Sequence, residues 1–437
     1  MTAPTPPVPL PPASKARPRP SLGELLRLSL YLGLVGFGGG VSVLAIIESL
    51  VVARHGWLTP KEFANTATIA QMLPGGAATN TLAQVGLRFH GVRGAAVTYG
   101  GFVLPGALSI GLLAWAYVHF GALPHADAFL AGLNAAVVGV IGAITVKMAR
   151  TSVVRLWQMG VVALALLLTL VGQAGPLEVA FLGIAGGLGW DLGIERARLL
   201  RFGRKRFQPA PQVGLPDEGG TLQHAAGPES AESAAPREPA SPPRPPGMLW
   251  LLPAGSLLPG ALMVLLPMAV IFFRIGLGAY GGGFAIIPAL HRELVDTALI
   301  TERQFADAVA VGKLTPGPVL LMATFLGYVK EGLAGALVAT LAILTPPFLL
   351  VVALSAWLTR VRSRRWVRAA LRGLTPAVVG LMLAAALTLG QTMKTGVGLS
   401  LAAVTAMTLI RFETVNPVAL LAVCGVVRLA LHLGLGL

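Results

Sequence analysis

Long apolar stretches alternate with short polar blocks along almost the whole chain. Residues 95–118 and 333–358 are almost entirely apolar, and residues 159–171 with their flanks form another such run. A helix rises about 1.5 Å per residue, so roughly 20 apolar residues cross the hydrocarbon core of a bilayer. The pattern predicts an all-α polytopic membrane protein.

The same pattern occurs twice. The run Gly36-Phe37-Gly38-Gly39-Gly40 returns as Gly278-Ala279-Tyr280-Gly281-Gly282-Gly283, and a Pro-Gly turn follows each copy, first at 74–76 and then at 316–318. The shared register includes Trp57-Leu58-Thr59, Phe63, Gly86, Gly91, Gly94 and Pro105 against Ile300-Thr301, Phe305, Gly327, Gly332, Gly335 and Pro346. Paired, glycine- and proline-broken apolar segments are typical of secondary transporters with a site between two repeats.

Composition agrees and excludes other classes of protein. Only 12% of the 437 residues are charged and 55% are hydrophobic, whereas about a quarter of a soluble protein is charged. The net charge of +15 comes largely from basic blocks between apolar spans, which mark topology, so no nucleic-acid partner is expected. A single cysteine, Cys424, excludes an intramolecular disulfide and a thiolate metal cluster. We expect no metal, no cofactor and, in the absence of nucleotide or hydrolase motifs, no enzyme.

Changes in composition divide the chain into five parts. Residues 1–20 form a Pro-rich, disordered cytoplasmic tail, and 21–195 the first repeat. Residues 196–247 are a linker, first basic and then rich in Pro and Ala. An extra apolar segment, 248–268, has no equivalent in the first half, and 269–437 form the second repeat.

The distribution of Lys and Arg predicts that the repeats are inverted. Basic residues near span ends favour the cytoplasm. Residues 119–127 contain no Lys or Arg and should be outside, whereas the equivalent loop of the second copy, 360–372, carries six arginines and should be inside. One extra crossing at 248–268 would produce this flip. Six crossings per repeat plus this one give roughly thirteen spans, fewer if the glycine-broken spans are re-entrant.

The broken segments suggest an anion site. Each glycine costs a helix about 1 kcal/mol and each proline interrupts it. Irregular backbone at bilayer depth is tolerated where it is buried in protein or lines a hydrated cavity. A helix that restarts after a Pro-Gly turn directs free N–H groups and a positive dipole end at that cavity, which suits an oxyanion. The alternative is that the glycines serve only close helix packing.

The predicted substrate-binding residues lie in the glycine runs, the two turns and their flanks. They are Gly38, Gly39, Gly40, Gln71, Pro74, Gly75, Gly76 and Asn80 in the first copy, and Gly281, Gly282, Gly283, Lys313, Thr315, Pro316, Gly317 and Pro318 in the second. Lys313 would add a cation beside the second turn where the first copy has neutral Gln71, unless it snorkels to an interface. Asn80 and Thr315 could donate hydrogen bonds to an oxyanion, or bond to neighbouring helices.

Together these motifs resemble the chromate ion transporter family, in its long-chain, two-domain form. The resemblance covers both halves and rests on Gly36–Gly39, the Trp57-to-Phe63 spacing, Gln71–Gly75, Gly281–Pro288 and Leu314–Val319. It implies a bacterial inner-membrane protein that exports chromate and confers chromate resistance.

Three positions depart from that family and lie in the predicted site. Gly40 and Gly76 stand where the family usually has proline, and Lys313 stands where it commonly has Gln. These departures bear on the substrate more than on the fold. We therefore keep a carrier of sulfate or another oxyanion, even an importer, as the alternative, and a non-transporting scaffold as a third. The expected partners are chromate or a related oxyanion and membrane lipid, with a homodimer left open.

Overall fold

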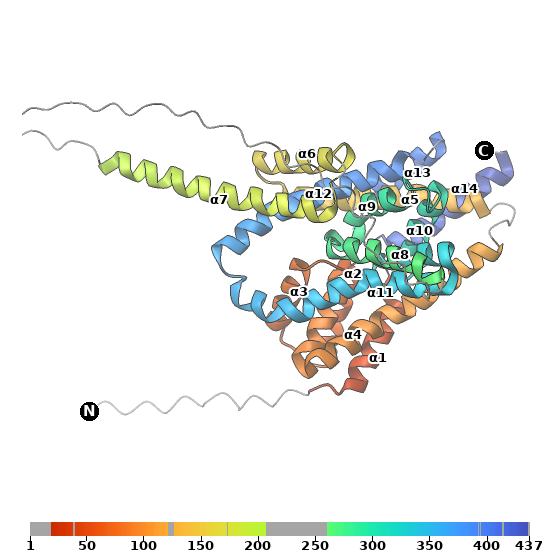
Figure 1. Cartoon of the computed structure of the whole chain (residues 1–437), viewed down its shortest axis with the longest axis horizontal. Helices are drawn as coiled ribbons and strands as arrows, with labels where there is room; N and C mark the ends of the chain where they lie inside the picture. Colours follow the sequence, from red (N-terminus) through yellow and green to blue (C-terminus); the bar gives the residue numbers. More distant parts are fainter. Residues whose placement is uncertain are drawn as a thin grey trace, which may run out of the picture.

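The computed structural model describes residues 19–37, 40–120, 126–172, 174–206, 260–391, 393, 395–412 and 415–435, and within these every regular element is helical (Figure 1). The first repeat comprises α1 (Leu22–Val35), α2 (Gly40–Glu48), the π-helix η1 (Ser49–Arg54), α3 (Pro60–Met72), α4 (Ala77–Phe120), α5 (Ala126–Ser152), α6 (Leu156–Leu170) and α7 (Pro176–Arg206). The second comprises α8 (Gly260–Leu277), the 3₁₀ helix η2 (Gly281–Ile286), α9 (Ile287–Leu294), α10 (Glu302–Leu314), the 3₁₀ helix η3 (Val319–Leu321), α11 (Met322–Val361), α12 (Arg365–Gln391), α13 (Gly396–Arg411) and α14 (Pro417–Leu435).

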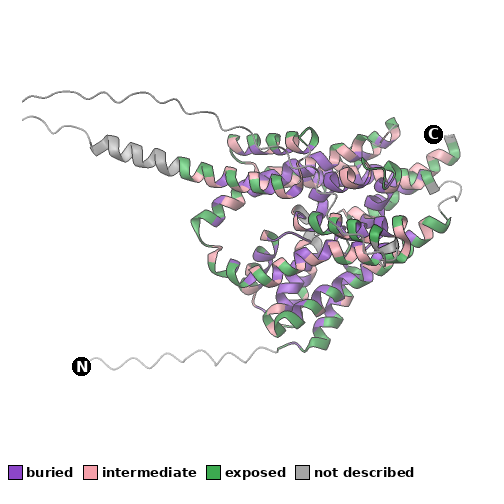
Figure 2. Ribbon diagram, in the orientation of Figure 1, coloured by how far each residue is buried: buried purple, intermediate pink, exposed green. Residues whose placement is uncertain are grey.

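The predicted fold class is confirmed. Five helical segments among the described residues are long and apolar enough to cross a membrane, and three shorter apolar helices accompany them. Buried residues concentrate where helices meet, while the outer faces stay exposed (Figure 2). Those faces carry large apolar side chains such as Leu108, Leu341 and Met407, each at least 65% exposed. Exposed apolar surface on this scale suits a lipid environment, and the chain is an all-α polytopic membrane protein.

In each repeat, a short helix and the start of a long helix form a hairpin with the Pro-Gly turn at its tip. Thr59 caps α3 and Thr301 caps α10, each accepting a hydrogen bond from the backbone N–H three residues on. Next to each cap, Phe63 and Phe305 are buried. In the first hairpin, an ion pair between Glu62 and Arg88 joins the two arms at their base. The repeated Thr and Phe therefore fix where each hairpin begins.

The long helices α4 and α11 are each bent back on themselves at a repeated glycine. Gly91 has φ +59° and Gly332 has φ +57°, values that favour glycine. Across the first bend, the backbones of Gly86 and Gly94 touch, and Gly327 and Gly335 do the same across the second. The register of glycines in the sequence thus encodes two equivalent sharp turns, each joining a short hairpin arm to a long apolar one.

The two repeats exchange their last two helices. Helix α5 packs against α13 and α14 of the second repeat, and α12 packs against α6 and α7 of the first. At the centre, α5 and α12 pack against each other. Small residues allow the close approach: Gly132 of α5 lies against the backbone of Cys424 on α14, and Gly373 of α12 against that of Gly183 on α7. Most of the bundle is therefore held together between repeats rather than within them.

Equivalent junctions lie at opposite ends of the bundle. In Figure 1, the junction between α11 and α12 lies at the left with the end of α7, whereas α4 ends at the right, where α5 begins. At the left, Arg365 and Arg372 bond to Asp191 of α7. At the other end, Arg303 of α10 pairs with Asp127 of α5. This arrangement is the one expected of two inverted repeats.

Some predicted features fall outside the described residues. They are the amino-terminal tail up to residue 18, residues 207–247 of the linker, residues 248–259 of the extra apolar segment, and Gly38 and Gly39 of the first glycine run. Residues 260–268 form the first part of α8, which continues into the second repeat. Residues 196–206 continue α7 as helix. The number of spans stays a prediction.

Candidate functional site

The two Pro-Gly turns meet at equivalent residues. A Cβ placed on Gly76 would lie 3.3 Å from the Cβ of Pro318. The register that pairs Gly75 with Gly317 also pairs Gly76 with Pro318. Contact between equivalent positions occurs where a two-fold axis passes, so the pseudo-symmetry axis of the molecule runs through the turns.

Each turn also packs against the long helix of the other repeat. Gly75, with φ +112°, would bring a Cβ to 2.8 Å from the Cβ of Pro347 on α11. Reciprocally, Gly106 of α4 lies against the carbonyl of Pro316, and Gly317, with φ +108°, lies next to it. Gly106 and Pro347 follow the equivalent prolines 105 and 346. A side chain at Gly75 or Gly106 would therefore press on the other repeat.

The second glycine run joins this centre. The backbone N–H of Gly75 donates to the carbonyl of Ala279 at 2.8 Å. Gly283 has φ +92°, and a Cβ there would lie 2.7 Å from Leu320, just after the second turn. Three of the four predicted backbone breaks, the two turns and residues 279–283, are thus brought together. Gly40 begins α2.

Polar atoms without partners lie directly after the first turn. Among the described residues, Thr79 Oγ1, Asn80 Oδ1 and Gln84 Nε2 are buried and make no hydrogen bond. The Asn80 amide Nδ2 donates to the carbonyls of Ala70 at 3.2 Å and Pro74 at 2.9 Å. Asn80 therefore caps the end of α3. A buried polar group without a partner costs about 1–3 kcal/mol, which marks this stretch as one that awaits a ligand or water.

The second turn carries a cation instead. Lys313, in the last turn of α10, places its Nζ 3.6 Å from the ring centroid of Phe284 in η2. The Thr315 hydroxyl donates to the carbonyl of Val311 at 3.0 Å. Gln71, equivalent to Lys313, is exposed at the end of α3. The two sides of the centre thus differ in charge, as the sequence predicts, and the lysine rests on an aromatic face.

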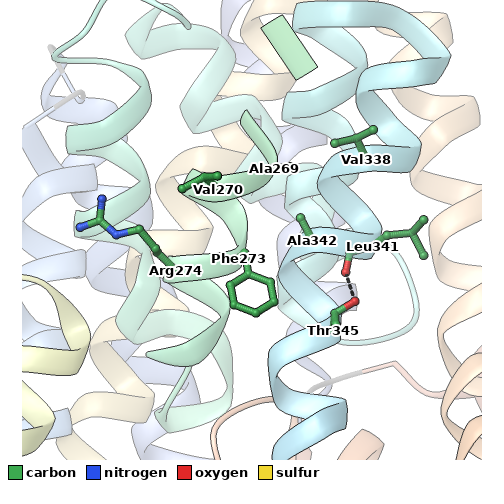
Figure 3. Close-up of a pocket in the computed structure, with 8 residues that line it drawn as sticks. All are labelled: Ala269, Val270, Phe273, Arg274, Val338, Leu341, Ala342 and Thr345. Atoms are coloured by element: carbon green, nitrogen blue, oxygen red, sulfur yellow. Dashed lines mark hydrogen bonds between the residues drawn. The ribbon is translucent and has the colours of Figure 1, made fainter. Parts of the chain in front are cut away.

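Two cavities lie away from the turns. One, of about 440 Å³, is a groove between α8 and α11 lined by Phe273, Val338 and Leu341 among others, with Arg274 extending away from it (Figure 3). Thr345 bonds to the carbonyl of Leu341 there, so its hydroxyl is already used. The other, of about 380 Å³, lies between α1 and η1 and is lined by Arg27, Arg54 and Trp57 among others. The turns themselves are closed against each other.

Sequence reasoning missed several residues of the centre. Gly106 and Pro347 were detectable, because each follows a proline of the shared register. Thr79 and Gln84 carried no such signal, since the second copy has apolar residues at 319–323 and 325–326. Ala279 contributes only its carbonyl, which no side-chain pattern reveals.

Comparison with known proteins gives the family. A chromate transport protein of Cupriavidus metallidurans is 30% identical over 86% of this chain and 84% of its own length. A probable chromate transport protein of Synechococcus elongatus is 28% identical over 86% of each chain, and a chromate transport protein of Pseudomonas aeruginosa 26% over 86% and 83%. No solved structure matches. Residues 23–190 and 266–429 match the chromate transporter family, one match for each repeat, and the chain belongs to that family.

Proposed function

We propose that this protein is a secondary active transporter that exports chromate, a divalent tetrahedral oxyanion, across the bacterial inner membrane by alternating access. Membership of the chromate transporter family supports chromate transport. Direction, mechanism and location are parts of the proposal.

The observation that carries the proposal is the meeting of the two turns at hairpin tips. Helices α3 and α10 each have 13 residues, so each is roughly 20 Å long, short of the roughly 30 Å of hydrocarbon. Hairpins of this length, entering from opposite sides, would end near the middle of the membrane. There α4 restarts at Ala77, directly after the first turn, and its free amides favour an anion.

Side chains around the tips add donors. The Thr79 hydroxyl and the Gln84 amide nitrogen are unpartnered donors after the first turn, and Lys313 lies before the second. An oxyanion between the tips could accept from both sides. Since Gly76 and Pro318 are in contact, the hairpins must separate to admit it. If the hairpins separate first toward one side of the membrane and then toward the other, the anion site is exposed to each side in turn, which is alternating access.

The membrane potential supports export. In a cell that is negative inside, each negative charge leaving gains about 2.3 kcal/mol per 100 mV, and chromate carries two. The sequence has no nucleotide-binding motif, so we expect the membrane potential, rather than ATP hydrolysis, to provide the energy for transport.

Chromate accumulation in a sensitive host, with and without the gene, tests the function. We expect lower accumulation and greater resistance with the gene. Higher accumulation would establish an importer, and unchanged accumulation with correctly inserted protein would favour the scaffold. Competition by sulfate against labelled chromate in everted vesicles then separates the two substrates. Full inhibition by equimolar sulfate would contradict a chromate-selective site.

Inversion of the repeats can be tested by labelling. Since Cys424 is the one cysteine of the chain, a Cys424→Ala background accepts single cysteines at Ala122 and Ser363. A membrane-impermeant maleimide should label Ala122→Cys from outside and Ser363→Cys only from the cytoplasmic face. Labelling of both from one side would overturn the inverted arrangement.

A further inference from the structure

A buried carboxylate lies outside the candidate site. Asp307, on α10, is 1% exposed. Its Oδ2 accepts a hydrogen bond from the Tyr117 hydroxyl of α4 at 3.0 Å, and its Oδ1 accepts from the Asn134 amide of α5 at 3.0 Å. The Arg303 guanidinium is more distant, with Nε 3.8 Å from Oδ2. Buried ionisable residues in membrane proteins are energetically costly and commonly functional.

The equivalent residue of the first repeat occupies an equivalent position. The register of the turns pairs Asp307 with Asn65. Asn65, on α3, accepts a hydrogen bond from Arg362, just after the end of α11, at 2.7 Å. The Tyr117–Asp307 bond and the Arg362–Asn65 bond therefore each join a hairpin to the far end of the other repeat's long helix. At the end where α11 meets α12 the acceptor is an amide, which does not titrate. At the opposite end it is a carboxylate, which does.

We propose that Asp307 is a proton-binding site that controls the attachment of α10 to α4 and α5. A proton from the adjoining aqueous phase would convert the carboxylate to a carboxyl group. The proton would bind a lone pair of one carboxylate oxygen and make both oxygens poorer acceptors, so the hydrogen bonds from Tyr117 and Asn134 would weaken and the attraction of Arg303 would be lost. Nothing is oxidised or reduced. Resting on the proposed function, the protonated state is the one in which the second hairpin opens at this end.

Few charged or hydrogen-bonding side chains surround Asp307. On its own helix lies Arg303, which also pairs with Asp127 of α5. Helix α4 contributes Tyr117, and α5 contributes Asn134 and Asp127. Helix α11 and η3 present no charged contact to it among the described residues. Helix α14, which also packs against α10, carries the titratable residues Arg428 and His432. Proton binding to Asp307 would therefore mainly change the contacts between α10 and the helices α4 and α5.

The test measures the spacing of α10 and α4 in purified, detergent-solubilised protein without substrate. Spin labels on Phe120→Cys, at the end of α4, and Leu299→Cys, three residues before α10, both exposed positions, in the Cys424→Ala background report the distance between the ends of the two helices. Acidification should broaden or lengthen the distance distribution. In Asp307→Asn, a neutral mimic, the distribution should be the same at every pH. The matched control Asp296→Asn, an exposed carboxylate, should keep the pH response.

A wild-type-like pH response in Asp307→Asn, or no response in the otherwise unmodified labelled protein, would overturn the proposal. Should Asp307→Asn fail to insert, the double variant Tyr117→Phe, Asn134→Ala keeps the carboxylate and removes its neutral donors. The midpoint of its response must then differ from that of the parent, and an equal midpoint refutes the role. Because no substrate is present, failure of chromate transport would leave this result intact. In proteoliposomes, chromate flux should respond to an imposed pH gradient several-fold, and Asp307→Asn should lose that response.

Discussion

The two hairpins share a backbone but differ in chemistry. Both are capped by threonine, turn at a glycine with φ near +110° and lean on the opposite long helix. After its turn the first carries the neutral polar residues Thr79, Asn80 and Gln84, each with one buried atom that makes no hydrogen bond. The second has the charged residues Asp307 and Lys313 on α10 and apolar Leu320 to Met322 after the turn. In the proposed mechanism, the shared backbone would allow the two hairpins to move alike, and their different side chains would provide the substrate contacts and the charge.

The largest expected effect follows from disrupting one bend. In Gly86→Leu, the side chain would meet the Gly94 backbone, so the first hairpin could not close against the long arm of α4. We expect loss of folded protein from the membrane, measured by immunoblot and size-exclusion chromatography. Gly100→Leu is the control, because nothing lies within 4 Å of a Cβ there. Normal amounts of monodisperse Gly86→Leu would show that the bend tolerates bulk.

Blocking either turn should remove transport while the protein still inserts. A leucine at Gly75 would press on Pro347, and one at Gly317 on Leu321, each at a backbone conformation costing about 1–2 kcal/mol for a side chain. Chromate flux in everted vesicles should fall to background in both variants, with membrane abundance close to wild type. Full activity in either would reduce that turn to a packing feature and break the equivalence of the hairpins.

Removing the charge difference between the turns should change substrate affinity. Lys313→Gln makes the second turn resemble the first. The loss of a charged donor is worth roughly 1.5–3 kcal/mol, so the KM for chromate should rise about tenfold or more, while insertion is unchanged. Concentration-dependent uptake of chromate and of sulfate measures this. If the variant transported both anions with the same kinetics as the wild-type protein, Lys313 would not belong to the site.

The smallest effect is expected on the neutral side. Thr79→Val keeps the shape of the side chain and deletes an unpartnered hydroxyl. The loss of one hydrogen bond to bound anion, about 1 kcal/mol, should raise the KM about fivefold, whereas the unliganded protein should become no less stable. Thermal unfolding and transport kinetics of the same preparation separate these results. A fall in stability without a change in KM would make Thr79 structural.

Local patterns in the sequence predict much of this molecule. The repeat, the Pro-Gly turns and the charge asymmetry at Lys313 follow from residue types at matching spacing, because glycine and proline restrict the backbone wherever they occur. The exchange of α6 and α7 for α13 and α14 was not predictable, since it depends on which apolar faces meet far along the chain. Asp307 was missed because it lies within an ordinary capped helix and its counterpart, Asn65, is neutral.

The exchanged helices limit how the molecule can move. Two repeats that were separate bodies could rotate against each other. Here, however, α5 packs against α13 and α14 of the second repeat, and α12 packs against α6 and α7 of the first. Pulling the halves apart would expose the interfaces of α5 with α13 and α14 and those of α12 with α6 and α7, together with the contacts of α5 with α12 and of α4 with α11. We therefore expect the exchanged helices to stay in place during transport, while the two short hairpins move about their bends at Gly91 and Gly332.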